Sequence, residues 1–262
     1  MKRFILLLFI SSTIFFGCSE KDTPEPVLFA QFESVAAQYT INKENHTAPQ
    51  FIGGTASFVY KGNRIVKRIG GYIGAVGAGG YAGIYIDAIY DEVEYTSANL
   101  ITLRTKDDIG YLDGSVNKRE IILEKGLIKQ KITYDDKSNH AYTDTIFYFY
   151  DSQRRLQSTK QGLKHRIVER DYFFDSNGNL QRIVGVEKSR YDDTVLSKTE
   201  ELFGGYDDKP NPLKGQCLWQ DLLYRTLSTN NFTTYSYKTE GASESKSWVL
   251  VYGDDGRVDY SN

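Results

Sequence analysis

The fold class of this 262-residue chain is decided by one stretch, Asp171-Tyr172-Phe173-Phe174-Asp175-Ser176-Asn177-Gly178-Asn179-Leu180-Gln181-Arg182-Ile183-Val184. The stretch begins with aromatic residues and ends with alternating apolar and polar residues, and both patterns suit a pleated strand surface. Between the two runs, Asn177-Gly178 is a strong hairpin signal, because Asp and Asn bond their own backbone in turns and Gly adopts positive φ. The stretch therefore predicts an antiparallel β-hairpin.

The same order of aromatic strand, polar turn and second strand recurs along the chain. The intervals between copies vary from about 25 to 45 residues, so the repeat is degenerate and does not describe a strict solenoid. It predicts a long antiparallel meander of hairpins. The further copies cover 58–66, 121–128, 147–156 and 248–258.

These hairpins predict an all-β fold: a curved antiparallel meander of hairpins, forming an open sheet or a barrel, with one or two short helices. The chain has 20 Tyr and 14 Phe but one Met and five Pro, a usage that favours strands. Aromatic residues on both faces of 147–150 fit a strand that is covered on both sides or a curved sheet. The helix candidates are 217–223 and the segment 28–39, whose apolar spacing does not exclude a strand.

The N-terminus has the pattern of a secretory signal. Lys2-Arg3 precedes thirteen uncharged residues, 4–16, a run shorter than the roughly 20 residues that a helix needs to span a bilayer. The run ends at Gly17-Cys18, which resembles the lipobox of bacterial lipoproteins, where the cysteine is lipidated and becomes the first mature residue. The alternative is an ordinary signal peptide cleaved near Ser12. The cysteine directly after the apolar run favours the lipoprotein.

Lipidation at Cys18 would divide the chain into three parts. These are the lipoprotein signal peptide (1–17), a tether stiffened by two prolines (18–26) and a single antiparallel β-domain (27–262). Acyl chains contribute about 0.8 kcal/mol per buried methylene group, so several of them hold a protein on a membrane. The acidic stretch after the cysteine resembles the signal that sends Bacteroidota lipoproteins to the outer cell surface. We expect a lipid-anchored outer-membrane protein facing the exterior, with the periplasmic face as the alternative.

The charge and cysteine content limit which partners the chain can bind and whether it can form a disulfide. Without the signal peptide the chain has 30 basic and 34 acidic residues. The sequence contains no basic stripe, which argues against a nucleic-acid partner. Cys217 is the one cysteine besides Cys18, so no intramolecular disulfide is expected in the lipidated chain. We interpret Cys217 as a small buried hydrophobic residue.

Two short motifs resemble landmarks of an uncharacterised Bacteroidota lipoprotein family. They are Asp207-Asp208-Lys209-Pro210-Asn211-Pro212 and Leu227-Ser228-Thr229-Asn230-Asn231-Phe232-Thr233. That family has a porin-like, curved antiparallel β-domain built of hairpins similar to YD repeats, and the resemblance covers residues 50–262. It implies this fold and a membrane location, but no activity and no catalytic residues. The glycine-rich segment 70–83 departs from the family pattern.

The segment 70–83 carries seven glycines and no charge. Part of it, 77–82, matches a loose G-x-G-x-x-A, but a dinucleotide site needs a parallel strand before the motif and a helix after it. Strand-like Ile84-Tyr85-Ile86 follows instead. We interpret the segment as a flexible loop, or as a hairpin whose small residues allow close backbone contact. Its aromatic residues Tyr72 and Tyr81 are candidate ligand contacts.

The sequence lacks motifs for catalysis, metals and cofactors. No G-x-S-x-G, H-E-x-x-H or C-x-x-C occurs, and the three histidines are far apart. Asp175-x-Asn177-x-Asn179 begins like a calcium loop, but Leu180 stands where glycine is needed, so turn capping is the favoured interpretation. We therefore expect neither a cofactor nor a metal.

Trp219 and Trp248 complete the candidate ligand contacts, because flat aromatic faces stack on sugars and peptides. Both lie among apolar residues, which favours core packing. In the absence of a catalytic motif, we expect a non-enzymatic surface binding or structural module for a glycan, a protein or an apolar ligand. One alternative is a glycoside hydrolase with two carboxylates about 5 to 9.5 Å apart. The other is a carrier of lipid or another apolar molecule, with a lined internal cavity.

Overall fold

The computed structural model describes residues 32–41, 54–77, 80–110, 117–135 and 142–261. Within these ranges the side chains of 72–77, 80–84, 117, 135, 142 and 143 are not described. The predicted signal peptide, the predicted tether and Cys18 lie outside the described residues.

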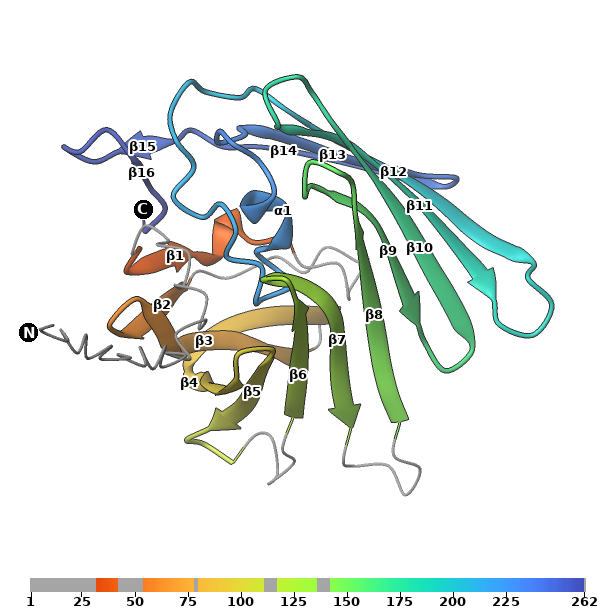
Figure 1. The fold of residues 1–262 in the computed structure, drawn as a ribbon, viewed down its shortest axis with the longest axis horizontal. Coiled ribbons are helices and arrows are strands. Elements are labelled where there is room, and N and C mark those ends of the chain that lie inside the picture. The colour runs from red at the N-terminus through yellow and green to blue at the C-terminus, as the bar shows by residue number, and fades with distance from the viewer. Residues whose placement is uncertain (1–31, 42–53, 78–79, 111–116, 136–141, 262) are drawn as a thin grey trace, which may run out of the picture.

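Fourteen strands of the described chain form one antiparallel sheet, in which each strand pairs with the next along the sequence. The sheet curls around an interior, and its first and last strands do not pair with each other, so the sheet stays open (Figure 1). The all-β antiparallel meander is therefore confirmed in its open form. The strands are β1 (Ser34–Ala36), β2 (Thr55–Lys61), β3 (Arg64–Gly77), β4 (Gly80–Ser97), β5 (Leu100–Asp107), β6 (Asn117–Glu124), β7 (Leu127–Asp135), β8 (Tyr142–Tyr150), β9 (Leu156–Gly162), β10 (Arg166–Phe174), β11 (Leu180–Ser189), β12 (Val195–Gly204), β13 (Thr234–Thr239) and β14 (Ala242–Ser247).

The turns confirm the predicted repeat. In all five copies the turn contains a residue with positive φ: Gly62 (φ 61°), Gly126 (φ 75°), Arg154 (φ 63°), Gly178 (φ 80°) and Gly256 (φ 74°). In the copies of Arg154 and Gly178, the aspartate three positions earlier uses Oδ1 to accept the backbone N–H groups two and four positions after it, at 2.8–2.9 Å. Asp175 is one of these aspartates, so it caps its turn as predicted.

The two helix candidates are short. In 28–39 the described part forms β1 and a 3-10 turn, η1 (Ala37–Tyr39), so a strand and a helical turn both occur there. The run 217–223 consists mostly of turns and leads into one four-residue helix, α1 (Leu223–Thr226). Among the described residues, no helix has the length and apolar character needed to cross a membrane.

A separate two-stranded ladder lies near the C-terminus, formed by β15 (Val251–Tyr252) and β16 (Val258–Asp259).

The sequence predicted a strand starting at Trp248, and that start is wrong. Trp248 donates its indole N–H to the carbonyl O of Gln38 at 2.8 Å. This contact with the other end of the sheet accounts for the break between β14 and β15.

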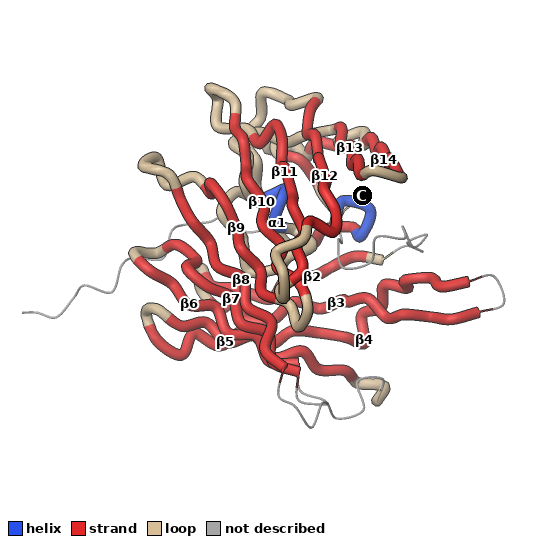
Figure 2. The backbone as a smooth tube through the Cα atoms, turned by 90° about the vertical axis from the view of Figure 1, so that its right-hand side faces the viewer, coloured by secondary structure: helices blue, strands red, loops and turns tan. Residues whose placement is uncertain are grey.

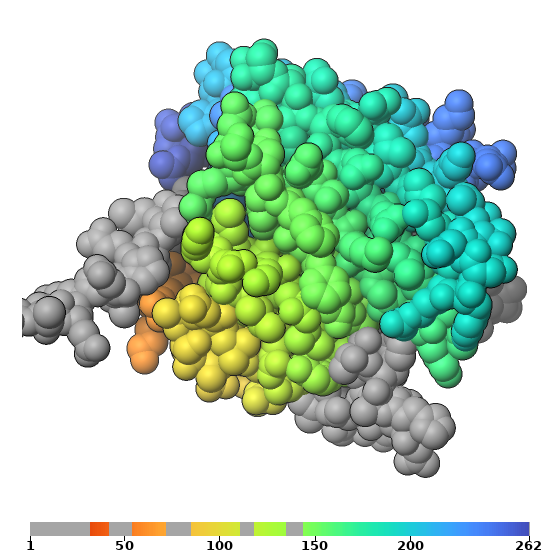
Figure 3. Space-filling view, turned by 45° about the vertical axis from the view of Figure 1, so that its right-hand side comes forward, coloured from red at the N-terminus to blue at the C-terminus, as the bar shows by residue number. Residues whose placement is uncertain are grey.

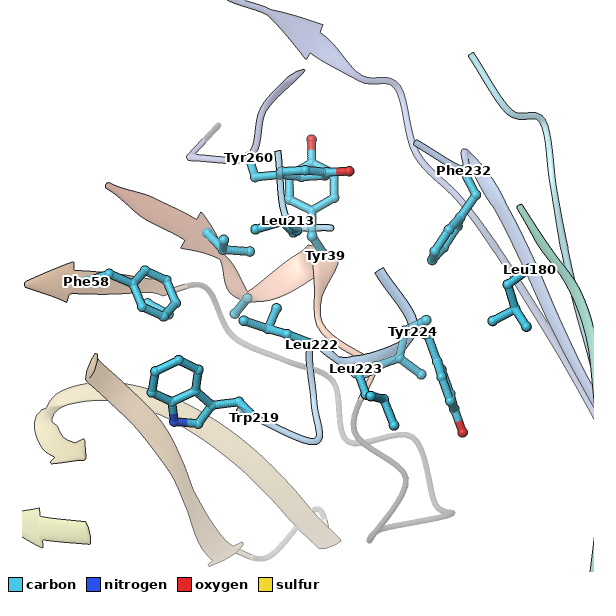
Figure 4. Packing of buried hydrophobic residues seen from close by; sticks show 14 of the residues in the cluster. Tyr39, Phe58, Leu180, Leu213, Trp219, Leu222, Leu223, Tyr224, Phe232 and Tyr260 are labelled. Carbon is cyan, nitrogen blue, oxygen red and sulfur yellow. The ribbon is translucent and has the colours of Figure 1, made fainter. Parts of the chain in front are cut away.

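The chain itself fills the interior of the sheet. Residues 205–233, which connect β12 to β13 and include α1, run from the rim into the concave side; we call them the inner segment (Figure 1). Their large apolar side chains pack against those of the strands (Figure 4). Each such burial contributes roughly 1.5–3 kcal/mol, so the inner segment supplies much of the core. The members that are at most 4% exposed include Leu213, Trp219, Leu222, Leu223, Tyr224 and Phe232.

One buried cation, Arg225, ties the inner segment to both ends of the sheet. Its Nε donates to the carbonyl O of Tyr39 at 2.9 Å, and its Nη1 donates to that of Phe232 at 3.1 Å. The guanidinium also lies between 4.1 and 5.3 Å from the ring centroids of Tyr39, Phe232, Trp248 and Tyr260. Burial lowers the pKa of Arg225, but aromatic faces and carbonyl oxygens replace part of its hydration. We call these five residues the latch.

A second buried cluster joins the inner segment to the strands near the N-terminus. Trp219 Nε1 donates to Asp91 Oδ2 at 2.6 Å, and Arg119 Nη2 donates to Asp91 Oδ1 at 2.5 Å. Arg68 forms two hydrogen bonds with the Asp221 carboxylate, at 2.9 and 2.5 Å. Burial alone raises the pKa of Asp91, but Arg119 and Arg68 oppose it, so this pKa lies below its ordinary value.

Replacing Arg225 with methionine should destabilise the fold, because the carbonyl groups of Tyr39 and Phe232 lose a charged donor. Hydrogen bonds to charged groups contribute about 1.5–3 kcal/mol each, so R225M should lower the free energy of unfolding by at least about 3 kcal/mol. Urea titration followed by tryptophan fluorescence measures this. In the control R257M, the exposed side chain of Arg257 is removed and the change should stay within about 0.5 kcal/mol. Equal stability of R225M and the wild type would contradict the latch.

The lowered pKa of Asp91 gives a test with acid. The folded protein holds this carboxyl deprotonated below the ordinary pKa of 3.8, so its contribution to stability is present above that pH and is lost as the pH falls through the lower, folded value. D91N removes one partner of a buried ion pair and should cost about 3–5 kcal/mol at neutral pH. Urea midpoints should show the gap between wild type and D91N shrinking below about pH 4. A gap that is independent of pH would contradict this assignment.

Candidate functional site

The two tryptophans proposed as ligand contacts lie in different parts of the interior. Trp219 is 1% exposed, points into the interior, and packs edge-on against Phe58 with their ring centroids 5.4 Å apart (Figure 4). Trp248 is half-buried and belongs to the latch. Both tryptophans therefore pack against the core, as the apolar residues around them in the sequence predicted.

Tyr72 and Tyr81 lie in the hairpin of β3 and β4. Tyr72 is opposite Tyr85 and Tyr81 is opposite Val76 in the register, while the side chains of Tyr72 and Tyr81 are outside the described ones. The glycine-rich segment is therefore a hairpin and not a loop, and no βαβ unit surrounds it. Its outer part extends away from the rest of the sheet (Figure 2).

A polar hollow on the concave face of β10–β13 is the best candidate site. Its volume is about 220 Å³. The cross-strand register explains its composition, because Arg170, Gly185, Thr199 and Thr239 stand opposite one another on four successive strands. The lining residues are Val168, Arg170, Gly185, Val186, Glu187, Ser197, Thr199, Glu201, Tyr237 and Thr239.

Gly185 keeps the hollow open. A Cβ at this position would collide with Oγ1 of Thr199 and would touch Cγ of Arg170 at 3.8 Å. Glycine is unusual inside a strand unless something must approach the backbone closely. Here the missing side chain lets the Thr199 hydroxyl approach the backbone of β11 closely.

The charged groups of the hollow differ in their hydrogen-bond partners. Glu187 accepts a hydrogen bond from Arg166 at 2.8 Å. Glu201 is 1% exposed and accepts one from the hydroxyl of Tyr235 at 2.9 Å. Burial raises the pKa of Tyr235, so its hydroxyl stays protonated and able to donate. No hydrogen bond or ion pair joins Arg170 to another residue of the described ranges.

The register of the two glutamates does not favour a pair of catalytic carboxylates. Glu187 is opposite Ser197, and Glu201 lies four residues further along the same strand. The two backbone positions are therefore about 13 Å apart along the strands, whereas glycosidases need carboxylates about 5 to 9.5 Å apart. The hollow instead offers guanidinium and hydroxyl donors together with hydroxyl and carboxylate acceptors, which suits binding of a hydroxyl-rich molecule.

A broader depression of about 450 Å³ lies over β12–β14. Small residues line most of it, and Lys246 is its one charged member. It therefore provides fewer groups to orient a ligand than the hollow does. No group of three or more His, Cys, Asp and Glu residues suited to a metal ion occurs among the residues that the structure describes.

Analysis of the sequence missed the residues of the hollow. Arg170, Gly185, Thr199 and Glu201 lie in the middle of three successive strands, away from the turns that the motifs mark. The available signal is the alternation within each strand: Arg170 lies two positions from buried Val168 and Tyr172, and so takes an inward position. Only the register between the strands shows that these residues meet, and this register could not be predicted from the sequence.

No protein-family model matches the chain, and no curated protein matches it. Among solved structures, it is similar to a porin-like protein from Bacteroides uniformis ATCC 8492, with 12% identity, a TM-score of 0.50, and coverage of 89% of this chain and 90% of that chain. It is also similar to a porin-like protein from Bacteroides vulgatus ATCC 8482, with 12% identity, a TM-score of 0.49, and coverage of 86% and 88%. At such identity the likeness to the B. uniformis protein concerns the fold alone, and it supports a porin-like β architecture for this chain.

Proposed function

We propose that the protein is a lipid-anchored outer-membrane protein, without enzymatic activity, that binds a glycan in the hollow over β10–β13. One observation carries this proposal: a guanidinium, two carboxylates and several hydroxyl groups line a single space of about 220 Å³. Sugar hydroxyls both donate and accept hydrogen bonds, so they match a site that offers both kinds of partner. The ring of Tyr237 adds an aromatic surface to the same lining.

The packing of the interior favours a glycan over an apolar ligand. A lipid carrier needs an internal space lined by apolar side chains, but the inner segment occupies the concave side with its own. Trp219, Leu222 and Leu223 are each 1% exposed there. The hollow that remains beside them is polar.

The convex face of the sheet supports a domain that lies in water and reaches the membrane through its anchor. Figure 3 shows this face as a continuous surface over the strands in yellow, green and teal. Cross-strand ion pairs lie on it among exposed apolar side chains such as Phe147 and Phe173: Glu169 binds Lys160 at 3.0 Å and Lys188 at 2.6 Å, and Lys106 binds Glu92 at 2.6 Å. Such pairs suit a hydrated surface, whereas a lipid-facing surface needs apolar side chains.

The anchor can be tested at Cys18. C18S should remove the acyl chains and release the protein from the membrane fraction, because the remaining chain has no other proposed attachment. Mass spectrometry of the mature N-terminus and immunoblots of membrane and soluble fractions measure this. C217S is the matched control, since Cys217 lies in the interior beside Thr226, with Sγ and Oγ1 3.1 Å apart, and burial raises its pKa. Release of C217S, or retention of C18S with an unmodified N-terminus, would contradict the anchor.

The hollow can be tested by filling it. G185V should place two methyl groups between Arg170 and Thr199, and it should weaken glycan binding at least about tenfold, which corresponds to about 1.4 kcal/mol. Valine suits a strand, but its Cβ has to displace the Thr199 hydroxyl, so the urea midpoint is measured to establish that the variant is folded. G162V is the matched control, because a Cβ at Gly162 meets nothing within 4 Å. Unchanged binding by G185V would place the glycan elsewhere.

A glycan array probed with the full chain, purified from membranes in detergent, tests the function itself. We expect retention on at least one class of glycan, with no reducing ends released during long incubation. Turnover of a glycan without stable binding would overturn the proposal in favour of a hydrolase. Binding to no glycan, together with lipid that copurifies and is detected by mass spectrometry, would overturn it in favour of a carrier.

A further inference from the structure

We propose that the outer part of the β3–β4 hairpin joins two copies of this chain into a dimer, by pairing edge to edge with the same part of a second copy. We call this outer part, residues 73–77 and 80–84, the ribbon. The hollow lies on other strands, β10–β13, so the dimer is independent of the ligand proposed for it.

The ribbon has no third strand beside it in the described chain. Along β3, Ile69 is the last residue to pair with β2, and along β4, Ile89 is the first to pair with β5. In the ribbon the two strands pair only with each other, from Ile73 opposite Ile84 to Gly77 opposite Gly80. Each strand of the ribbon therefore has an outer edge along which no described strand runs.

A bulge at the base sets the ribbon off from the sheet. Three residues of β4, 87–89, stand opposite Gly70 alone, and Gly70 has a φ of 112°. A Cβ at this position would collide with the ring of Tyr85, so only glycine suits it. Bulges bend the strand in which they occur, and the ribbon extends away from the rest of the sheet (Figure 2).

The two ends of the sheet carry features that hinder edge pairing, and the ribbon carries none of them. Strand β1 has three residues, and β14 bears the charged residues Glu244 and Lys246. Short edge strands and edge charges are devices that keep a sheet from pairing with another chain. By contrast, the sequence from 70 to 86 contains no charged residue and no proline. The ribbon is thus the part of the sheet best suited to pairing with another strand.

The backbone of the ribbon favours a protein strand over lipid as its partner. A two-stranded hairpin alone in water has marginal stability. In a bilayer, the N–H and C=O groups of both outer edges would lack partners, which is why open sheet edges are not found in hydrocarbon. A strand of a second copy supplies those partners, and a two-fold axis lets the same edge of both copies form the contact.

Small residues make room for this contact. Glycine occupies four positions of the ribbon, and Ala75 stands opposite Ala82. Glycine inside a strand is typical of a place where another backbone approaches closely. Ala75 is the middle residue of 73–77, and Ala82 is the middle residue of 80–84. Pairing of a whole ribbon strand with its own copy, antiparallel about a two-fold axis, therefore places one of these alanines opposite itself.

Cysteine cross-linking in isolated membranes locates the contact. In a C217S background, A75C and A82C each place a thiol at the middle of one edge of the ribbon. Opposite residues of an antiparallel pair have Cα atoms about 4.5 to 5.5 Å apart, within the reach of a disulfide. We expect one of the two variants to give a dimer on a non-reducing gel after mild oxidation. S245C is the matched control, because exposed Ser245 lies on the free edge of β14, and it should stay monomeric.

The variant A75K/A82E tests whether the contact needs an uncharged edge. Within one copy the new lysine and glutamate stand opposite each other, so the hairpin keeps its own pairing, whereas the two-fold contact brings like charges together. Sedimentation velocity of the full chain in detergent should show a dimer for the wild type and at least about tenfold weaker association for the variant. S245K should leave the association unchanged. Urea midpoints establish that each variant is folded.

Three results would overturn the proposal. The first is a lack of cross-linked dimer from both A75C and A82C, and the second is a dimer that A75K/A82E leaves intact. The third is cross-linking of S245C in their place, which would move the contact to β14. A monomeric wild type, together with binding of C18S to phosphatidylethanolamine vesicles that A75K/A82E abolishes, would replace the second copy with lipid. The glycan array is unaffected by each of these results, so the proposed function is tested separately.

Discussion

The Arg225 guanidinium links the two ends of the sheet: it donates a hydrogen bond to the carbonyl O of Tyr39 after β1, and it lies against the rings of Trp248 and Tyr260 after β14. The sheet needs such a device because it is open: β1 and β14 do not pair, and unpaired strand edges are reactive surfaces. Tyr39 follows β1, and Trp248 and Tyr260 follow β14, so the ring contacts of Arg225 reach both ends. A side chain of the inner segment thus takes the place that a strand ladder holds in a closed barrel. The depth of the concave side and the position of the hollow depend on that closure.

The interior is divided into two unlike halves. Around β3–β6, buried charges are matched to each other: Asp91 has Arg119, Thr105 and Trp219, and Arg68 has Asp221. Such a network fixes the inner segment and leaves little to attract a ligand. Around β10–β13, polar and charged groups line an open hollow of about 220 Å³. The contrast between the halves is the physical reason for assigning binding to the second, because both are built from the same repeating hairpins.

The sequence was informative wherever the determining interaction is local. Asp175 and Gly178 belong to one turn, and their hydrogen bonds and φ follow from residues within four positions, so the hairpins could be predicted. The start of the strand at Trp248 could not, because its indole N–H donates to Gln38, 210 positions away. The site was missed for the same reason. Arg170 and Thr199 face one hollow only because Gly185 stands between them in the register of β10, β11 and β12.

The place of the latch residues along the chain has a consequence for how the protein acquires its structure. Neighbouring strands of a meander can pair as soon as each hairpin is complete, since their contacts are close in sequence. Arg225, however, meets Trp248 and Tyr260 only after the chain has extended past both of them. The strand pairs can therefore form first, and the contacts that link the two ends of the sheet form last.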